Sequence, residues 1–234
     1  MKGFLALAIC LLPLGLFGQW SHQLQFGWKL GSDQAVESVR LTDTLEYSFS
    51  KKSLRYPSGA FMLTYQINET LLFRTGIDGT KTPVDVRVVN TKTNDDVFYE
   101  RRTFADLHVP LEIQYEASKG FFLNGGFSVN TRVEFFRYES SGLEEFEEMA
   151  RNSMREVSVN YRFGTTIKFI DWLGVDLMYD RPLMNLVKSP LSYQGDEADV
   201  KFKYGTWTMR LVYFFEWQKL KKSLNQNSGK RDFW

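Results

Sequence analysis

Residues 105–115 contain the side chains best suited to chemistry, namely two carboxylates and a histidine on one predicted β-strand. Successive side chains of a strand point to opposite faces, so Asp106, His108 and Glu112 share one face. A carboxylate that orients an imidazole can make it the general base of a hydrolase. His108 with Asp106 or Glu112 is therefore one hypothesis for an active site.

A hydrolase of this kind also needs a nucleophile close to the histidine. Ser128 and Ser158 would face the same side, but neither belongs to a nucleophile motif. The alternative interpretation is structural, with the histidine held in a buried polar network by Arg74 or Arg132. Pro110 lies in the same strand and lacks a backbone N–H, so we expect a local bulge or bend there rather than a catalytic feature.

The opposite face of this strand is wholly apolar and must pack against a soluble core or against lipid. Its residues are Ala105, Leu107, Val109, Leu111, Ile113 and Tyr115. Two-faced segments of this kind occur eight times along the chain, and an even number is typical of bacterial membrane barrels. They are residues 24–30, 61–67, 71–78, 105–115, 121–135, 157–169, 175–180 and 207–216.

The connections between these segments alternate strictly between short and long. The short ones are residues 68–69, 116–120 and 170–174, and the long ones are residues 31–58, 79–103, 136–156 and 181–205. Transmembrane barrels have this asymmetry, with tight periplasmic turns and long outer loops. The chain is therefore predicted to be all-β: an eight-stranded antiparallel up-and-down transmembrane β-barrel with short periplasmic turns and long extracellular loops.

Aromatic residues gather at the short-turn end of the strands, as in the interfacial girdle of a membrane barrel. They are Trp20, Tyr65, Tyr115, Phe121, Phe169, Trp172, Tyr213, Phe215 and Trp217. The polar strand faces combine glycines with charges of both signs, which suits a crowded barrel interior. We expect polar faces inside, apolar faces against lipid and no open pore, because an eight-stranded interior is filled by its own side chains.

The first 18 residues have the pattern of a secretory signal peptide, with Lys2, an apolar run and then Gly18-Gln19. The single cysteine, Cys10, lies inside this segment. Removal of residues 1–18 leaves 28 basic and 28 acidic residues, so no net charge favours nucleic acid. We expect no nucleic-acid binding, no metal centre and no organic cofactor. The barrel is predicted over residues 19–217.

Three other segments are candidates for contact with protein partners. Residues 84–89 and 97–101 flank a turn and predict a hairpin that extends above the membrane. In residues 142–155 the apolar residues recur at helical spacing, which predicts a short amphipathic helix that caps the barrel mouth or docks a partner. Residues 218–234 are basic and end in an aromatic pair, and we expect a periplasmic tail that is flexible or binds a partner.

Three motifs resemble those of the PorT-like family of small outer-membrane β-barrels. Leu107-His-Val-Pro-Leu-Glu-Ile-Gln-Tyr115 is similar to a family strand of the form L-x-I-P-L-x-x-x-Y. Phe121-Phe-Leu-Asn-Gly-Gly126 resembles the next strand. Tyr179-Asp-Arg-Pro-Leu-Met-Asn185 resembles a Y-x-x-G-L-x-N segment, with Pro182 in place of the glycine. The resemblance implies location in the outer membrane of a Gram-negative cell, and one namesake of the family serves type IX protein secretion and gliding.

The leading hypothesis is a non-enzymatic outer-membrane barrel that acts as a scaffold or accessory subunit of an envelope complex. Lipid would surround it, and protein partners would bind its extracellular loops or its C-terminal tail. A link to type IX secretion would follow from the resemblance. Two alternatives stay open: a barrel-borne hydrolase that uses His108 with Asp106 or Glu112, and a secreted soluble barrel that holds a small ligand as lipocalins do.

Overall fold

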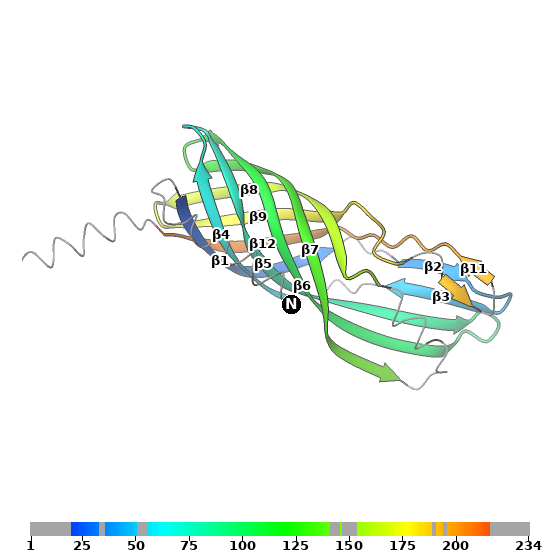
Figure 1. Ribbon diagram of the computed structural model, residues 1–234. Coiled ribbons are helices and arrows are strands. Elements are labelled where there is room, and N and C mark those ends of the chain that lie inside the picture. The colour runs from blue at the N-terminus through cyan, green and yellow to red at the C-terminus, as the bar shows by residue number, and fades with distance from the viewer. Residues whose placement is uncertain are drawn as a thin grey trace, which may run out of the picture.

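Most of the described chain is β-strand (Figure 1). The computed structural model describes residues 20–32, 36–50, 56–140, 146, 154–188, 191–193 and 196–215. The strands are β1 (Trp20–Ser32), β2 (Val36–Arg40), β3 (Leu45–Ser50), β4 (Tyr56–Gln66), β5 (Leu71–Asn90), β6 (Asp95–Ser118), β7 (Phe121–Ser140), β8 (Val157–Ile170), β9 (Leu173–Pro182), β10 (Leu191–Tyr193), β11 (Asp196–Ala198) and β12 (Thr206–Phe215). The predicted signal peptide, the C-terminal tail and most of the predicted helix lie outside the described residues. Within the described ranges, no helix has the length and apolar character needed to cross a bilayer.

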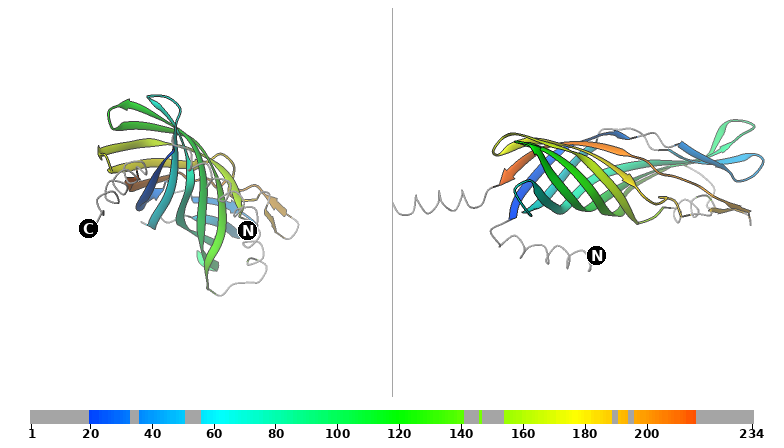
Figure 2. Two further views of the ribbon diagram at one scale, coloured as in Figure 1. Left: turned by 60° about the vertical axis from the view of Figure 1, so that its left-hand side comes forward. Right: turned by 90° about the horizontal axis from the view of Figure 1, so that it is seen from above.

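Eight of these strands close into a ring. Each pairs antiparallel with the next in the order β1-β4-β5-β6-β7-β8-β9-β12, and β12 pairs with β1. The strands run obliquely around this ring (Figure 2). Residues 67–70, 119–120 and 171–172 form short turns at one end, here called the short-turn end. The longer connections lie at the other end, the long-loop end. The prediction of an eight-stranded antiparallel barrel is confirmed.

Side chains of the ring alternate between a polar interior and an apolar exterior, as predicted. Buried polar residues of the ring include Gln25, Arg74, Glu112, Asp176 and Arg210. Exposed apolar residues of the ring include Phe26, Trp28, Phe61, Leu111, Ile113, Phe127, Val129, Ile167, Met209 and Leu211. This is the arrangement of a barrel surrounded by lipid. A soluble barrel that holds an apolar ligand would have the reverse arrangement.

The predicted aromatic girdle lies at the short-turn end. The ring of Tyr213 packs against those of Trp172 and Phe215, with centroid distances of 5.9 and 4.5 Å. All three side chains are exposed on the outside of the ring. The side chain of Trp20 and the whole of Trp217 lie outside the described residues.

Of the bulge or bend expected at Pro110, the bulge is wrong, because neither ladder of β6 shifts register there. Pro110 pairs in register with Ser128 of β7. The register of β6 against β5 is unchanged across the proline, but the pairs that Pro110 and Val109 would form are missing from that ladder. On β5, the residue opposite Pro110 in this gap is Gly76, which has a φ of 151°. A side chain there would collide with the carbonyl of Phe61, so this position requires glycine.

β5 and β6 continue beyond the barrel as one long hairpin (Figure 1). They turn at residues 91–94, which confirms the predicted hairpin. A second hairpin, β2–β3, was not predicted and pairs with the far part of β5. The far part of β7 pairs with β6. We call this sheet the extension; it comprises β2, β3 and residues 82–90, 95–104 and 134–140.

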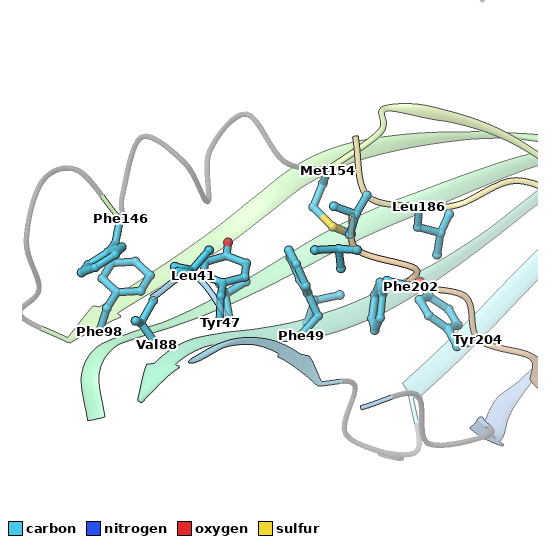
Figure 3. Packing of buried hydrophobic residues seen from close by; sticks show 14 of the residues in the cluster. Leu41, Tyr47, Phe49, Val88, Phe98, Phe146, Met154, Leu186, Phe202 and Tyr204 are labelled. Atoms are coloured by element: carbon cyan, nitrogen blue, oxygen red, sulfur yellow. The ribbon is translucent and has the colours of Figure 1, made fainter. Parts of the chain in front are cut away.

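The extension has an apolar core of its own (Figure 3). The core consists of Leu41, Tyr47, Phe49, Val84, Val86, Val88, Phe98, Phe104, Phe146, Met154, Leu186, Val187, Val200, Phe202 and Tyr204. The fully buried Phe49 packs against Tyr47 and Phe202, with centroid distances of 4.9 and 5.5 Å. Phe146 comes from the predicted helix and lies 6.2 Å from Phe98. This residue therefore packs in the extension rather than over the barrel mouth.

Phe49→Ala is expected to unfold the extension while the barrel stays closed. Truncation of a fully buried phenylalanine destabilises by about 3–5 kcal/mol, and few other contacts would compensate in a core of this size. Limited proteolysis of the refolded protein measures the extension, and heat-modifiable gel migration measures the barrel. Ser48→Ala, the next residue on the other face of β3, is the control. Equal protease resistance of the two variants would contradict this role for the core.

Candidate functional site

Buried arginines and carboxylates cross the barrel interior. Arg74 on β5 is fully buried, and its Nε donates to Glu112 Oε2 at 2.6 Å. Its Nη1 donates to Asp176 Oδ1 at 3.1 Å. Arg162 on β8 contacts the other oxygen of Glu112, with 3.2 Å between Nε and Oε1. One carboxylate on β6 therefore holds arginines from two sides of the ring.

The ion pairs continue from Arg162 to a second shared carboxylate. Arg162 Nη2 donates to Asp78 Oδ2 at 2.8 Å, and Arg210 Nη2 donates to Asp78 Oδ1 at 2.6 Å. An isolated ion buried in such a site carries a penalty of several kcal/mol, so each charge depends on its partners. We call this set the ion-pair network; its members are Arg74, Asp78, Glu112, Arg162, Asp176 and Arg210.

Glycine allows the network to cross an intervening strand. Gly126 of β7 is paired with Glu112 of β6 on one side and with Arg162 of β8 on the other. The contact between Glu112 and Arg162 therefore passes over a strand position that has no side chain. A Cβ at Gly126 would also collide with the carbonyl of Leu111.

The same arrangement occurs elsewhere in the ring. Gly27 of β1 is paired with both Arg210 and Ser58, and Arg210 Nε donates across it to Ser58 Oγ at 2.8 Å. Gly164 likewise lies between hydrogen-bonded side chains of β7 and β9. The glycines of the polar faces thus provide the space in which side chains of non-adjacent strands meet.

Toward the long-loop end, Asp106 is paired with Arg132 rather than with the histidine. Arg132 Nε donates to Asp106 Oδ1 at 2.8 Å, and Thr82 Oγ1 donates to Asp106 Oδ2 at 2.5 Å. Arg132 Nη2 also donates to the hydroxyl of Tyr204 at 2.9 Å. The ring of Tyr204 packs 5.6 Å from that of Phe202 in the extension core. Tyr204 therefore connects the barrel interior to the extension.

His108 is buried, but the carboxylates proposed to orient it are held by arginines. Asp106 and Glu112 make the contacts described above, and His108 instead faces Ser128 and Asp180. Its Nδ1 lies 3.4 Å from Ser128 Oγ and 3.8 Å from Asp180 Oδ2. A Ser-His-Asp triad places the serine and the acid at opposite ring nitrogens. Here both lie at the same nitrogen, so this geometry is not that of a triad.

The predicted structural partners of the histidine are also corrected. Arg74 and Arg132 bind carboxylates, and neither contacts the histidine among the described interactions. The other candidate nucleophile, Ser158, donates to Asn160 Oδ1 at 3.2 Å. The prediction of a histidine within a polar interior agrees with its burial, but its neighbours differ because strand register decides which side chains meet.

A small polar cavity lies beside His108. Its lining includes Lys29, Asp106, Arg132 and Tyr204. The cavity volume is about 20 Å³, which is enough for about one water molecule. In the part of the chain that the structure describes, no group of three or more histidine, cysteine, aspartate or glutamate side chains could hold a metal ion. This cavity suits water rather than an organic substrate.

Gly126→Ala is expected to destabilise the barrel by about 1–3 kcal/mol, the usual effect of overpacking. Gly125→Ala is the control, because a Cβ at Gly125 would have no atom within 4 Å. In Gly126→Ala the backbone must move, which separates Glu112 from Arg162. The measurement is the temperature at which the folded gel band converts to the unfolded one. If both variants convert at the same temperature, the space at Gly126 is not required.

The solved structures that are similar to this chain include OprG and Ail, both at low sequence identity. OprG, an outer membrane protein from Pseudomonas aeruginosa, is 12% identical and has a TM-score of 0.51. The match covers 84% of this chain and 96% of OprG, and it concerns the fold alone. Ail, the attachment invasion locus protein of Yersinia pestis, is 14% identical with a TM-score of 0.37, covering 84% of this chain and 99% of Ail. A search of curated proteins found no matching relative.

Residues 17–188 match a family described as the outer membrane protein beta-barrel domain. The matched region is well over half of the chain and contains β1 to β9. The closed ring, the polar interior and the apolar exterior agree with this match. The chain therefore belongs to the outer membrane protein β-barrel domain family.

Proposed function

We propose that the protein is a non-enzymatic scaffold or accessory subunit of an envelope complex, held in the outer membrane by its barrel. The observation that carries this proposal is the extension, a sheet with its own apolar core beyond the barrel. The barrel interior contains buried ion pairs, so it suits an anchor better than a passage.

The face of the extension opposite its core is the proposed partner surface. Arg101 donates to both oxygens of Asp85, at 2.6 and 3.0 Å. The guanidinium of Arg87 lies 5.0 Å from the centroid of the Tyr99 ring. Arginine and tyrosine are enriched where protein interfaces bind most strongly. Their fixed arrangement on a sheet favours recognition of a partner without loss of side-chain freedom.

The proposed orientation places the extension outside the cell and the short turns in the periplasm, as in bacterial barrels. Export would use the signal peptide predicted at residues 1–18. A role in type IX secretion rests on the three motifs that resemble the PorT-like family. The hydrolase alternative has less support, because His108 faces Ser128 and Asp180 through one nitrogen. The lipocalin-like alternative has less support, because the interior is polar.

Arg87→Glu is expected to remove a protein partner that the tagged wild-type chain retains on purification from native membranes. Loss of an arginine that is a hot spot of an interface weakens binding by about 2 kcal/mol or more, which is about 30-fold. Quantitative mass spectrometry of the co-purified proteins is the measurement. Lys119→Glu, at the exposed turn between β6 and β7, is the control. The proposal fails if Arg87→Glu folds normally and retains the same proteins as the control.

His108→Ala is expected to fold and to complement a strain that lacks this protein. The reason is that, among the residues that the structure describes, His108 makes only long contacts with its polar neighbours. Complementation, heat-modifiable migration and partner retention would be measured together. A variant that folds and keeps its partners but does not complement would favour the hydrolase instead.

A further inference from the structure

Aromatic rings cluster on the outside of the barrel at the long-loop end. They come from β8, β9 and β12, which are neighbours in the ring (Figure 1). The ring of Tyr179 lies 5.0 Å from those of Phe163 and Trp207 and 6.3 Å from that of Tyr161. Aromatic side chains favour the boundary between lipid and water. This cluster, here called the rim cluster, is therefore a second girdle, opposite the one at the short turns.

Arg181 lies beside the rim cluster with its side chain exposed. It is paired with Tyr161 in the register of β8 and β9. The side chains of Tyr161 and Tyr179 lie close enough to its guanidinium to interact with it. No carboxylate among the described residues forms an ion pair with Arg181. The tyrosines thus orient the guanidinium without neutralising its charge.

The position of Arg181 along the strand places it at headgroup level. The outward residues of β9 between the turn and this arginine are Leu173, Val175, Leu177 and Tyr179. With about 3.3 Å per residue and a strand tilt of about 40°, Arg181 lies roughly 20 Å along the barrel axis from Leu173. The apolar band of outer-membrane barrels is about 25 Å high. Arg181 is therefore the first outward-facing charge on β9, and it lies where the apolar band ends.

A second exposed cation lies next to this position. Lys203 Nζ donates to the carbonyl oxygen of Leu183 at 2.7 Å, and Leu183 is two residues beyond Arg181. The chain reaches this place because Gly205 passes close over Tyr179, where a Cβ would collide with the hydroxyl. The lysine keeps two further N–H donors. Lys203 is therefore held at the backbone two residues beyond Arg181, at the edge of the aromatic surface.

We propose that Arg181 and Lys203 bind a phosphate of an anionic glycolipid, the lipid A of the outer leaflet, while its acyl chains lie against the rim cluster. A guanidinium binds phosphate oxygens with two parallel hydrogen bonds, and an ammonium adds a point charge. The aromatic rings supply the apolar surface for the chains. This inference rests on the proposed outward orientation of the long-loop end, but it does not depend on any protein partner.

The test is native mass spectrometry of the purified full-length protein in detergent, titrated with lipid A that carries both phosphates. We expect one lipid to be retained, and we expect about tenfold weaker retention by Arg181→Gln, as for the loss of a charge-assisted hydrogen bond. Tyr161→Phe should weaken retention less, because only one support of the guanidinium is lost. Lys92→Gln, at the turn of the β5–β6 hairpin, should bind as the wild type does. Heat-modifiable migration confirms that each variant is folded.

Three results would overturn this proposal. Equal retention of intact and phosphatase-treated lipid A would show that the phosphate is not recognised. Displacement of lipid A by millimolar inorganic phosphate would indicate a site for the free ion. Retention of phosphatidylglycerol in preference to lipid A would contradict the outer-leaflet assignment. Each assay contains no other protein, so these outcomes are separate from failure of the proposed scaffold role.

Discussion

The carboxylate of Glu112 shares its two oxygens between Arg74 and Arg162, and the barrel depends on this kind of pairing. A charge inside a narrow barrel has little water around it and must find its partner within the ring. The partners lie on different strands, so pairing also fixes which strands face one another. Gly126 is needed for the same reason, because a side chain there would stand between the two charges.

Closure of the ring satisfies the backbone hydrogen-bonding groups, as the interior ion pairs satisfy the charged side chains. In hydrocarbon, an unpaired backbone N–H or C=O group has no partner, and only a sheet without edges satisfies all of them. The described strands meet this requirement by the pairing of β1 with β12. Outside the membrane the requirement is relaxed, and the same sheet continues into the extension, where β2 lies at an edge.

The extension is organised by a different force from the one that organises the barrel. Its core is apolar and lies on the inside of the fold, as in soluble proteins, whereas the apolar side chains of the barrel face outward. Tyr204 lies where the two arrangements meet. Its hydroxyl accepts a hydrogen bond from Arg132 in the barrel, and its ring belongs to the extension core. β5 serves both regions, because its buried face is polar in the barrel, as at Arg74, and apolar in the extension, as at Val86.

The alternation of residue types by itself determined the fold class and the inside and outside of the barrel. A period of two in residues 105–115 assigns His108 to the polar face whatever its neighbours are. Much less of the site could be predicted. The partners of His108 come from β7 and β9, and that choice follows from strand register, which a single strand's pattern does not contain.

The extension shows the same limit on what can be predicted from a single strand's pattern. Leu45, Tyr47 and Phe49 alternate with polar residues, so a strand signal was present in a connection interpreted as a loop. The packing of Phe49 against Phe202, far away in sequence, exists only once the ring has brought the two connections together. The sequence by itself thus determined which face each strand turns to lipid, since that depends on local alternation. Only the tertiary structure decided which charges pair and which loops share a core, because those contacts join residues distant along the chain.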